Sequence, residues 1–330
     1  MTQVSNFYYD LPEELIAQEP LPERTASRML VVSRANQSFH DDTFLNFPNY
    51  IRPGDCLVLN NTRVFPARLR GRRNNPTGGE VEVFLTRALD PEETTWKVLV
   101  KPGKRVRTGD TILFAEDFEA EVLTHGDYGE RTIRFKANRP ISELLEQLGQ
   151  TPLPPYIHRT PDTKDRQRYQ TVFAAKRGSV AAPTAGLHFT EDTLERCRAA
   201  GAEIAYVTLH VGLGTFAPLR EHDLSNVQLH EEYFEISQPH AATMLAAHRL
   251  LPVGTTSVRT IETACLRGGL GAMQGETNLF IYPGFRFRAT GGMLTNFHLP
   301  QSSLLMLVSA FAGQELTLAA YRHAVAQRYR

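Results

Sequence analysis

The chain has 330 residues, of which 42% are hydrophobic, and its 36 Lys and Arg residues balance its 36 Asp and Glu residues. This length accommodates two domains, or one large domain with an insertion. The balanced charge excludes a polycation that coats nucleic acid or anionic lipid along its whole length, and the hydrophobic content excludes global disorder.

Cysteines and hydropathy exclude further classes of protein. Cys56, Cys197 and Cys265 are far apart, which argues against a disulfide framework and against a cysteine zinc site. The first ten residues contain neither the basic region nor the apolar core of a signal peptide. The longest apolar stretch, near residues 304–312, is shorter than the roughly 20 residues that a membrane helix needs. We therefore expect a cytoplasmic protein with no membrane segment and no metal site.

Short strands are predicted to follow one another between residues 54 and 137. Polar and apolar residues alternate within them, and glycine-containing turns separate them. This regular spacing favours a small antiparallel β-barrel, which has no exposed sheet edge. The predicted strands are 56–59, 67–70, 80–85, 95–100, 111–114, 118–123 and 131–136.

Helices and strands alternate in the remainder of the chain. A proline-rich segment at 151–156 cannot continue a helix and is expected to return the chain from the barrel. The pattern predicts an α/β layered domain formed by both chain ends, residues 1–65 and 150–330, with an inserted β-barrel domain at 66–149. We expect helices at 140–149, 191–200, 241–250, 258–266 and 316–327, strands at 203–211 and 249–253, and a buried strand or helix at 304–311.

A glycine motif follows the predicted strand 203–211. Residues 212–217 match G-x-G-x-x-A, and Glu232 stands 20 residues after Gly212, as in a dinucleotide-binding turn. Pro218 and the absence of a continuous helical pattern argue against that interpretation. We favour a turn in which Gly212 and Gly214 let a ligand approach the backbone closely. A dinucleotide-dependent oxidoreductase stays open as an alternative, and bound NAD(P) would support it.

Three hydroxyl residues, Thr255, Thr256 and Ser257, precede the predicted helix 258–266, and Arg259 follows two residues later. Backbone N–H groups at a helix N-terminus favour anions, and an arginine adds a bidentate donor. These residues therefore predict a site for an anion or carboxylate. Simple helix capping is the alternative that needs no ligand.

Three histidines, His188, His210 and His298, lie in apolar, non-helical segments beside Gly, Thr, Asn or Pro. One such histidine is usually a packed core residue, but three in turn-rich segments favour a general base among them. The sequence His-Glu-Glu-Tyr-Phe at 230–234 lacks the second histidine of a zinc-protease motif.

Basic residues cluster at the start of the predicted barrel. Residues 51–180 contain 22 Lys and Arg against 17 Asp and Glu. Contact with nucleic-acid phosphates is one interpretation, and a non-catalytic RNA-binding module would use this surface alone. A solvated barrel face is the simpler interpretation of these residues. The arginines concerned are Arg63, Arg68, Arg70, Arg72 and Arg73.

Several long segments together resemble one family. They include Gly54-Asp-Cys-Leu-Val-Leu-Asn-Asn-Thr-Arg63, Pro183-Thr-Ala-Gly-Leu-His188 and Leu294-Thr-Asn-Phe-His298, and such segments cover almost the whole chain in order. They resemble the S-adenosylmethionine:tRNA ribosyltransferase-isomerase family of the queuosine pathway. The resemblance implies an α/β domain with an inserted barrel. It also implies transfer of the ribosyl part of S-adenosylmethionine to 7-aminomethyl-7-deazaguanine at the tRNA wobble position, with release of adenine and methionine.

This resemblance implies tRNA and S-adenosylmethionine as partners, the latter consumed as a substrate, so no separate cofactor is expected. We expect a monomer or a homodimer. The family continues past a Tyr-Arg-Phe sequence, whereas this sequence stops at Tyr329-Arg330. If the further stretch lines the active site, residues 1–330 are expected to fold but to turn over poorly.

The chemistry requires a base, because the sulfonium acidifies the ribose C5′ protons. We expect His188, His210 or His298 to be that base, with no ranking among them. Thr255, Thr256, Ser257 and Arg259 are expected to hold the methionine carboxylate or a tRNA phosphate. The other predicted substrate-binding residues are Asn60, Asn61, Arg63, Tyr169, Gln170, Thr184, Gly212 and Gly214.

Overall fold

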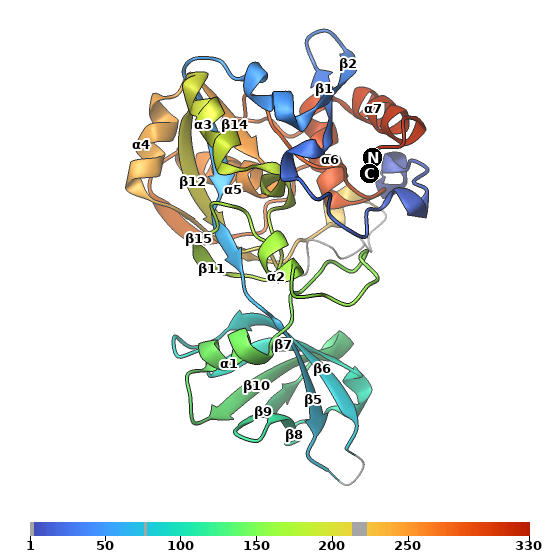
Figure 1. Cartoon of the computed structure of the whole chain (residues 1–330), viewed down its shortest axis with the longest axis vertical. Helices are drawn as coiled ribbons and strands as arrows, with labels where there is room; N and C mark the ends of the chain where they lie inside the picture. Colours follow the sequence, from blue (N-terminus) through green and yellow to red (C-terminus); the bar gives the residue numbers. More distant parts are fainter. Residues whose placement is uncertain (1–2, 76–77, 213–222) are drawn as a thin grey trace. The chain divides into compact units, whose positions relative to one another are not determined.

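The computed structural model describes residues 3–75, 78–212 and 223–330 (Figure 1). The chain divides into two compact units. The first contains Met1–Arg63, Pro154–Arg159 and Arg168–Arg330, and the second contains Val64–Leu153 and Thr160–Gln167. Residues 64–65, 150–153 and 160–167 thus cluster with the second unit, although the sequence interpretation places them in the α/β domain.

The second unit is a closed barrel with the strand order β10-β7-β6-β5-β8-β9. Each neighbouring pair is antiparallel. Alternate residues of β6, namely Val81, Val83 and Leu85, are almost completely buried, as expected for the inner face of a barrel strand. The predicted antiparallel barrel is therefore confirmed. Its strands are β5 (Arg68–Arg73), β6 (Glu80–Ala88), β7 (Thr95–Lys101), β8 (Thr111–Ala115), β9 (Phe118–His125) and β10 (Glu130–Ala137).

The first unit is built on a mixed sheet with the strand order β14-β3-β12-β13-β15. β14, β3 and β12 run parallel, whereas β13 and β15 are antiparallel to their neighbours. The predicted α/β architecture is confirmed. The strands of this sheet are β3 (Asp55–Asn60), β12 (Glu203–Leu209), β13 (Glu232–Ile236), β14 (Arg249–Val253) and β15 (Met273–Thr277).

Two small sheets accompany the main sheet. One pairs β1 with β2, and the other pairs β4 with β11. Their bounds are β1 (Arg28–Ser33), β2 (Ser38–Thr43), β4 (Thr62–Val64) and β11 (Lys176–Ser179).

Helices and short 3-10 segments connect these strands. The α-helices are α1 (Ile141–Leu148), α2 (Asp165–Arg168), α3 (Glu191–Ala199), α4 (Gln238–Ala246), α5 (Thr255–Leu266), α6 (Ser303–Ala312) and α7 (Gln314–Ala326). The 3-10 segments used below are η4 (Phe44–Tyr50) and η7 (Thr184–His188).

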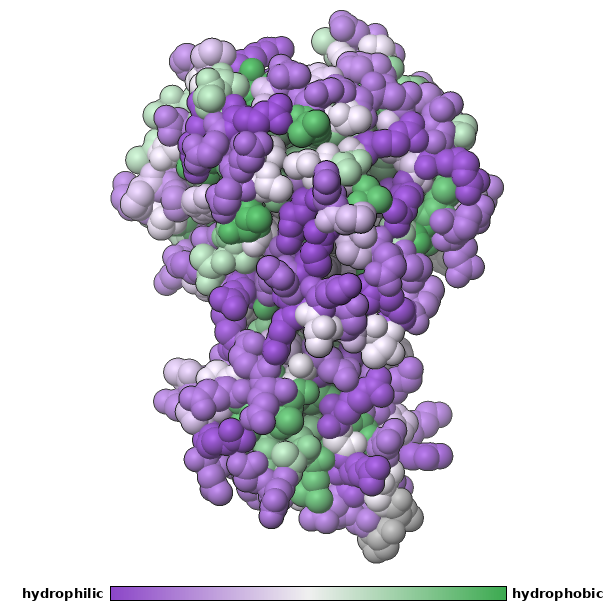
Figure 2. All heavy atoms as spheres, viewed as in Figure 1, coloured by the Kyte–Doolittle hydropathy of each residue, from purple (hydrophilic) through white to green (hydrophobic). Residues whose placement is uncertain are grey.

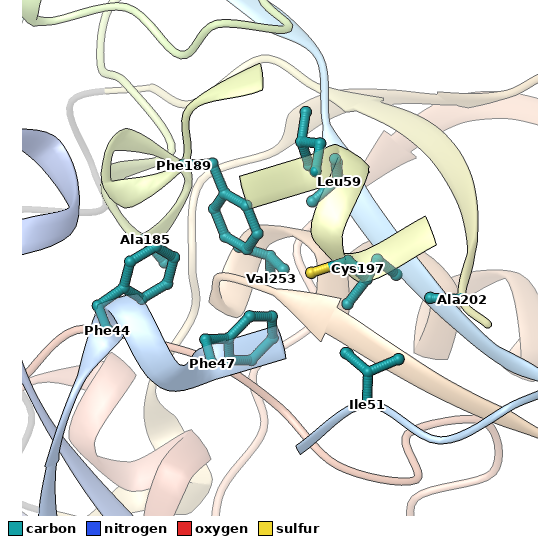
Figure 3. Close-up of a cluster of buried hydrophobic side chains, with 11 residues drawn as sticks. Phe44, Phe47, Ile51, Leu59, Ala185, Phe189, Cys197, Ala202 and Val253 are labelled. Atoms are coloured by element: carbon teal, nitrogen blue, oxygen red, sulfur yellow. The ribbon is translucent and has the colours of Figure 1, made fainter. Parts of the chain in front are cut away.

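Strand β3 is buried on both faces, which explains its unbroken apolar run. Leu57 and Leu59 belong to the hydrophobic cluster of Figure 3, which contains residues of η4 and α3. Cys56 and Val58 belong to a second cluster, which contains residues of α4 and α5. Because successive strand residues point to opposite faces, helical segments must cover the sheet on both sides.

Two helix predictions need correction at their boundaries. The helix predicted at 241–250 is wrong over its last residues, because α4 ends at Ala246 and β14 takes up the following apolar residues. Pro239 in the first turn favours the earlier start of α4. Helix α5 begins at Thr255, three residues earlier than predicted, because Gly254 makes the preceding turn at φ +86°. Residues 304–311 are helical and belong to α6.

Hydrophilic residues cover most of the face of the molecule that Figure 2 shows, with apolar residues between them in both units. Of the described helices, none is long and apolar enough on its own to cross a bilayer. Helices α6 and α7 meet that requirement only as a pair, and the pair is bent by 117°.

Candidate active site

Three parallel strands end at one edge of the main sheet. Residues Asn60 of β3 and Val207 of β12 are register partners, as are Leu59 of β3 and Val253 of β14. Ligands of open α/β sheets bind outside the carboxyl ends of such strands. This carboxyl edge therefore defines the candidate active site. The predicted site residues that end these strands or follow them directly are Asn60, Asn61, His210, Gly212, Thr255, Thr256 and Ser257.

The start of α5 offers both backbone and side-chain donors. The first-turn N–H groups of an α-helix have no partner within the helix, and Gly254 caps α5 without a side chain. Ser257 Oγ donates to the carbonyl of Val253 at 2.9 Å, so this hydroxyl serves the helix itself. Thr256 Oγ1 is buried and has no hydrogen-bond partner among the described residues. The hydroxyl of Thr256 is therefore left available to a ligand, whereas that of Ser257 is not.

His188 is the last residue of η7, and Ala185 of this segment lies close to the turn before α5. A Cβ atom added to Gly254 would lie 3.8 Å from the Cβ atom of Ala185 in η7. The Nε2 atom of His188 lies 2.8 Å from Oδ1 of Asn296. Burial lowers the pKa of His188 below its ordinary value of 6.5. The neutral imidazole, which is the form that a general base needs, is therefore the main form at pH 7.

Arg24 joins η7 to the segment that precedes it. Its Nη1 atom donates to the carbonyl of Leu187 at 2.8 Å, and its Nη2 atom donates to the carbonyl of Gln170 at 2.9 Å. Thr184 is the first residue of η7, and Tyr169 is buried, which raises its pKa. Arg24 thus holds together the two segments that contain three predicted substrate-binding residues, namely Tyr169, Gln170 and Thr184.

His210 lies directly after β12. Its Nδ1 atom is 2.8 Å from Thr62 Oγ1, and its ring stacks on that of Tyr233 with centroids 5.6 Å apart. Gly178 packs against the other side, where an added Cβ atom would be 2.5 Å from Nε2. Burial lowers the pKa of His210 to about 4. The ring is therefore neutral at pH 7 and tightly enclosed by its neighbours.

His298 contacts hydroxyl groups with both ring nitrogens. Its Nδ1 atom lies 3.2 Å from Tyr321 Oη, and its Nε2 atom lies 3.3 Å from Thr295 Oγ1. Tyr9 Oη donates to the carbonyl of His298 at 2.6 Å. Burial lowers the pKa of His298 to about 3. Within the described residues, no hydrogen bond joins any two of the three candidate histidines.

Asn60 connects the ends of β3 and β12. Its Nδ2 atom donates to the carbonyl of Leu209, and its Oδ1 atom accepts from the amides of Leu209 and Thr62, all at 3.0–3.1 Å. Asn61 Oδ1 accepts from Thr208 Oγ1 at 2.7 Å. Both side chains thus hold the carboxyl edge together, whereas Arg63 is exposed.

Arg259, Glu232 and Gly212 form one buried polar group. Arg259 Nη1 forms a short ion pair with Glu232 Oε2, and the side chains of both residues are 5% exposed. Gly212 N donates to Glu232 Oε1 at 2.8 Å. Sequence reasoning noted Glu232 only as part of a dinucleotide motif, and no spacing rule indicates its partner Arg259. Gly214, a predicted site residue, lies outside the described residues.

Residues 213–217 of the glycine motif lie outside the described residues, and its described neighbours argue against the dinucleotide interpretation. A dinucleotide fold connects two parallel strands through a helix after such a motif. Here β12 precedes the motif and the next described strand, β13, is antiparallel to it. Glu232 binds a backbone amide and an arginine within the protein, so its position does not match that of a ribose-binding acid.

Acidic residues face part of the predicted arginine cluster. In the register of β5 and β6, Arg70 pairs with Glu82 and Arg72 pairs with Glu80. Opposite charges at such positions stabilise a strand pair. These contacts favour the solvated-face interpretation for Arg70 and Arg72. Within the described part of the chain, no group of three or more His, Cys, Asp or Glu residues has the geometry to hold a metal ion.

These features define a class of protein: a mixed α/β unit with a polar site at the carboxyl edge of its sheet, and an antiparallel barrel inserted in its sequence. A family model described as "Queuosine biosynthesis protein" matches residues 4–330. The chain belongs to this family.

Named relatives match almost the whole chain. A protein of Solibacter usitatus, named S-adenosylmethionine:tRNA ribosyltransferase-isomerase, is 54% identical over 99% of this chain and 96% of its own length. One of Symbiobacterium thermophilum with the same name is 51% identical with the same coverage. The crystal structure of S-adenosylmethionine tRNA ribosyltransferase from Thermotoga maritima is 35% identical, with a TM-score of 0.56, over 99% of this chain and 96% of that chain.

Proposed function

We propose that this chain is a transferase that moves the ribosyl part of S-adenosylmethionine to 7-aminomethyl-7-deazaguanine at the wobble position of tRNA, with isomerisation to epoxyqueuosine. The observation that carries this function is the match to relatives of that name over 99% of the chain at up to 54% identity. The site at the carboxyl edge of the sheet supports it, because a small-molecule substrate is expected there.

The proposed reaction begins with removal of a C5′ proton from the ribose beside the sulfonium. The resulting ylide expels adenine, and the tRNA amine then attacks the ribosyl skeleton. Epoxide closure releases methionine. The sum is redox-neutral and S-adenosylmethionine is consumed as a substrate, so the proposal includes no resident cofactor.

His188 is the proposed general base among the three candidates. Its Nε2 atom lies 2.8 Å from Oδ1 of Asn296, and a backbone hydrogen bond with Arg24 also orients the ring. Ala185 of the same segment, η7, lies beside Gly254, the turn before α5, where Thr256 has an unpartnered hydroxyl. His298 contacts hydroxyls with both nitrogens, and His210 is enclosed by Thr62, Tyr233 and Gly178.

The proposal places the enzyme in the cytoplasm, where tRNA is modified, as a monomer or a homodimer. Asn60, Asn61 and Arg63 are proposed to contact the modified base or the anticodon backbone. A binding module without chemistry would bind tRNA with a steep salt dependence but leave S-adenosylmethionine intact.

The test is to mix the full chain with S-adenosylmethionine and tRNA that carries the deazaguanine precursor. We expect adenine and methionine in equal amounts, together with a heavier nucleoside at the wobble position. Matched tRNA without the precursor should give neither product. If tRNA binds while S-adenosylmethionine stays unconsumed, the proposed function is wrong and the RNA-binding alternative is favoured.

A further inference from the structure

Arg24 contacts the candidate base His188 in two ways, although the two residues are far apart in the sequence. It is the first residue of η3 (Arg24–Ala26), a short 3-10 segment. Its Nη1 atom donates to the carbonyl of Leu187, the residue directly before His188, at 2.8 Å. The ring of His188 forms a hydrogen bond with the backbone of Arg24. One residue thus contacts both the main chain beside the base and the imidazole itself.

Arg168 forms a matching set of contacts in the opposite direction. Its Nη1 and Nη2 atoms donate to the carbonyls of Pro22 and Leu21 at 2.9 and 2.6 Å. Arg24 Nη2 donates to the carbonyl of Gln170 at 2.9 Å, so each arginine binds the segment that contains the other. These three hydrogen bonds join the two segments. The further bond from Arg24 to η7 is not needed for that link.

The two guanidinium groups repel each other. Burial and, to a smaller extent, the charge of Arg168 lower the pKa of Arg24 below its usual value of 12.5. Arginine stays protonated in proteins, so both groups are charged at pH 7. An uncharged side chain would link the two segments without this repulsion. The choice of arginine therefore favours a role for Arg24 beyond the link itself.

Apolar packing fixes the other side of η7. Phe189, directly after His188, belongs to the buried cluster of Figure 3 together with Ala185 and Phe44. The partly exposed ring of His188 lies against Phe44, with ring centroids 5.4 Å apart. Apolar packing is not directional, whereas hydrogen bonds are. The directions of the ring nitrogens therefore depend on the contacts with Asn296 and with the Arg24 segment.

We propose that Arg24 is a positioning residue of the reaction, which holds the main chain at Leu187 and the ring of His188 so that the imidazole faces the substrate in one orientation. Arginine suits this role better than lysine, because its planar fork donates in fixed directions to two carbonyls at once. This inference rests on the proposed function and on His188 as its general base.

The charge of Arg24 gives this role a second readout. Burial lowers the pKa of His188, the hydrogen bonds with Asn296 and with the Arg24 backbone raise it, and the charge of Arg24 lowers it. Arg24 is the charged group among these contacts. Loss of its charge should therefore raise the pKa of His188 and move the acid limb of kcat/KM upward by about half a pH unit. Arg24→Gln removes the charge, whereas Arg24→Lys keeps it and loses only the fork.

The test measures single-turnover release of adenine by the full chain, with folding checked by circular dichroism. Arg24→Gln and Arg24→Lys should both lower the rate about 10- to 100-fold, the scale expected when a reacting group is misplaced. Affinity for S-adenosylmethionine should change little, and only Arg24→Gln should move the acid limb. Arg168→Gln is the matched control, because Arg168 binds the carbonyls of Leu21 and Pro22 rather than η7. It should lower the midpoint of unfolding but keep a nearly full rate.

A double-mutant cycle with His188→Gln separates positioning from general destabilisation. Because Arg24 acts through His188, Arg24→Lys should change the remaining rate by less than about threefold in that background. Equal fold losses in the two backgrounds, or a full rate in the folded Arg24 variants, would overturn the positioning role alone. Failure of the wild type to release adenine would overturn the proposed function as well.

Discussion

The Nε2 atom of His188 lies 2.8 Å from Oδ1 of Asn296, and this contact joins residues 108 positions apart in the chain. Together with a backbone hydrogen bond from the ring to Arg24, it fixes the ring at the end of η7. A base oriented by a second side chain is a recurring arrangement in enzyme sites.

His188→Gln should lower turnover by about 10²- to 10⁴-fold, the usual contribution of a positioned general base. Affinity for S-adenosylmethionine should change little, because the substitution keeps a polar group of similar size. Single-turnover release of adenine measures this directly. The same rate is measured for His210→Gln and His298→Gln. If His188→Gln releases adenine at the wild-type rate and one of the other two variants does not, that other histidine is the general base.

Asn296→Asp should change the pH profile rather than only the rate. A carboxylate beside Nε2 favours the imidazolium, so it raises the pKa of His188, which burial holds below 6.5 in the wild type. The base is active when neutral, so the acid limb of kcat/KM should move upward by about one pH unit.

Asn296→Leu is the control for that shift, because it removes the acceptor without adding a charge. It should lower the rate without moving the acid limb to higher pH. An unchanged limb in Asn296→Asp would mean that the titration of His188 does not govern the reaction.

Arg249 and Asp55 form a paired contact that predicts acid sensitivity. Arg249 Nε lies 2.8 Å from Oδ1 and Nη2 lies 2.5 Å from Oδ2, and Asp55 is 2% exposed. Although burial opposes ionisation, the Arg249 and backbone hydrogen bonds lower the pKa of Asp55 below 3.8. This stabilisation is present above the unfolded pKa and is lost as the pH falls through the folded value.

Asp55→Asn should therefore reduce the free energy of unfolding by about 2–3 kcal/mol at pH 7, since Arg249 keeps partial access to solvent. The variant should also lose less stability than wild type below about pH 4. Urea unfolding followed by circular dichroism measures both effects. Glu203→Gln, at an exposed position on neighbouring β12, should leave the curve nearly unchanged.

Local patterns predicted the barrel strands well, and long-range contacts decided what was missed. Alternation and glycine turns identified β5 to β10 because each barrel strand buries one face. The sequence did not indicate β13 or β15, where Glu232 and Thr277 are buried polar register partners at positions that usually carry apolar residues. Their burial depends on partners distant in the chain, such as Arg259 for Glu232.

In the candidate site, too, local patterns were predicted correctly and long-range contacts were missed. The turn at Gly254 and the hydroxyls after it were evident as a helix start, and the structure moves that start by three residues. Three histidines were evident but could not be ranked, because their environments come from Asn296, Tyr233 and Tyr321, none of which is adjacent in sequence. The pairing of Arg24 with the carbonyl of Leu187 has no sequence signal.

Arg131 should be essential for the stability of the barrel. It is 3% exposed and donates five hydrogen bonds to backbone carbonyls, among them those of Gly103 at 2.5 Å and Val106 at 2.8 Å. Arg131→Met would leave these carbonyls unpaired and should cost about 2–4 kcal/mol. Fluorescence of Trp96, the sole tryptophan, reports on unfolding of this unit.

Arg134→Met is the matched control for Arg131, since Arg134 lies on the same strand with an exposed side chain. It should shift the midpoint of the Trp96 transition little. Equal shifts in the two variants would show that the carbonyl contacts of Arg131 contribute no more than an exposed arginine does.

His210 should make the stability of the α/β unit depend on pH in the range from 6.5 to 4. Burial lowers its folded pKa to about 4, whereas the unfolded chain takes up a proton near 6.5. The unfolded state therefore binds more protons in this range, and stability falls as the pH drops, by a total on the order of 2–3 kcal/mol.

His210→Phe keeps a ring against Tyr233 but cannot be protonated. It should be less stable than wild type at pH 7.5, because Thr62 Oγ1 loses its partner, yet it should lose less stability on acidification. Urea unfolding followed by circular dichroism at pH 7.5, 6 and 5 gives the slope of the free energy of unfolding against pH for wild type and for the variant. His188 and His298 remain in both proteins, so the difference in slope isolates the proton of His210, and parallel curves would contradict its burial as a neutral ring.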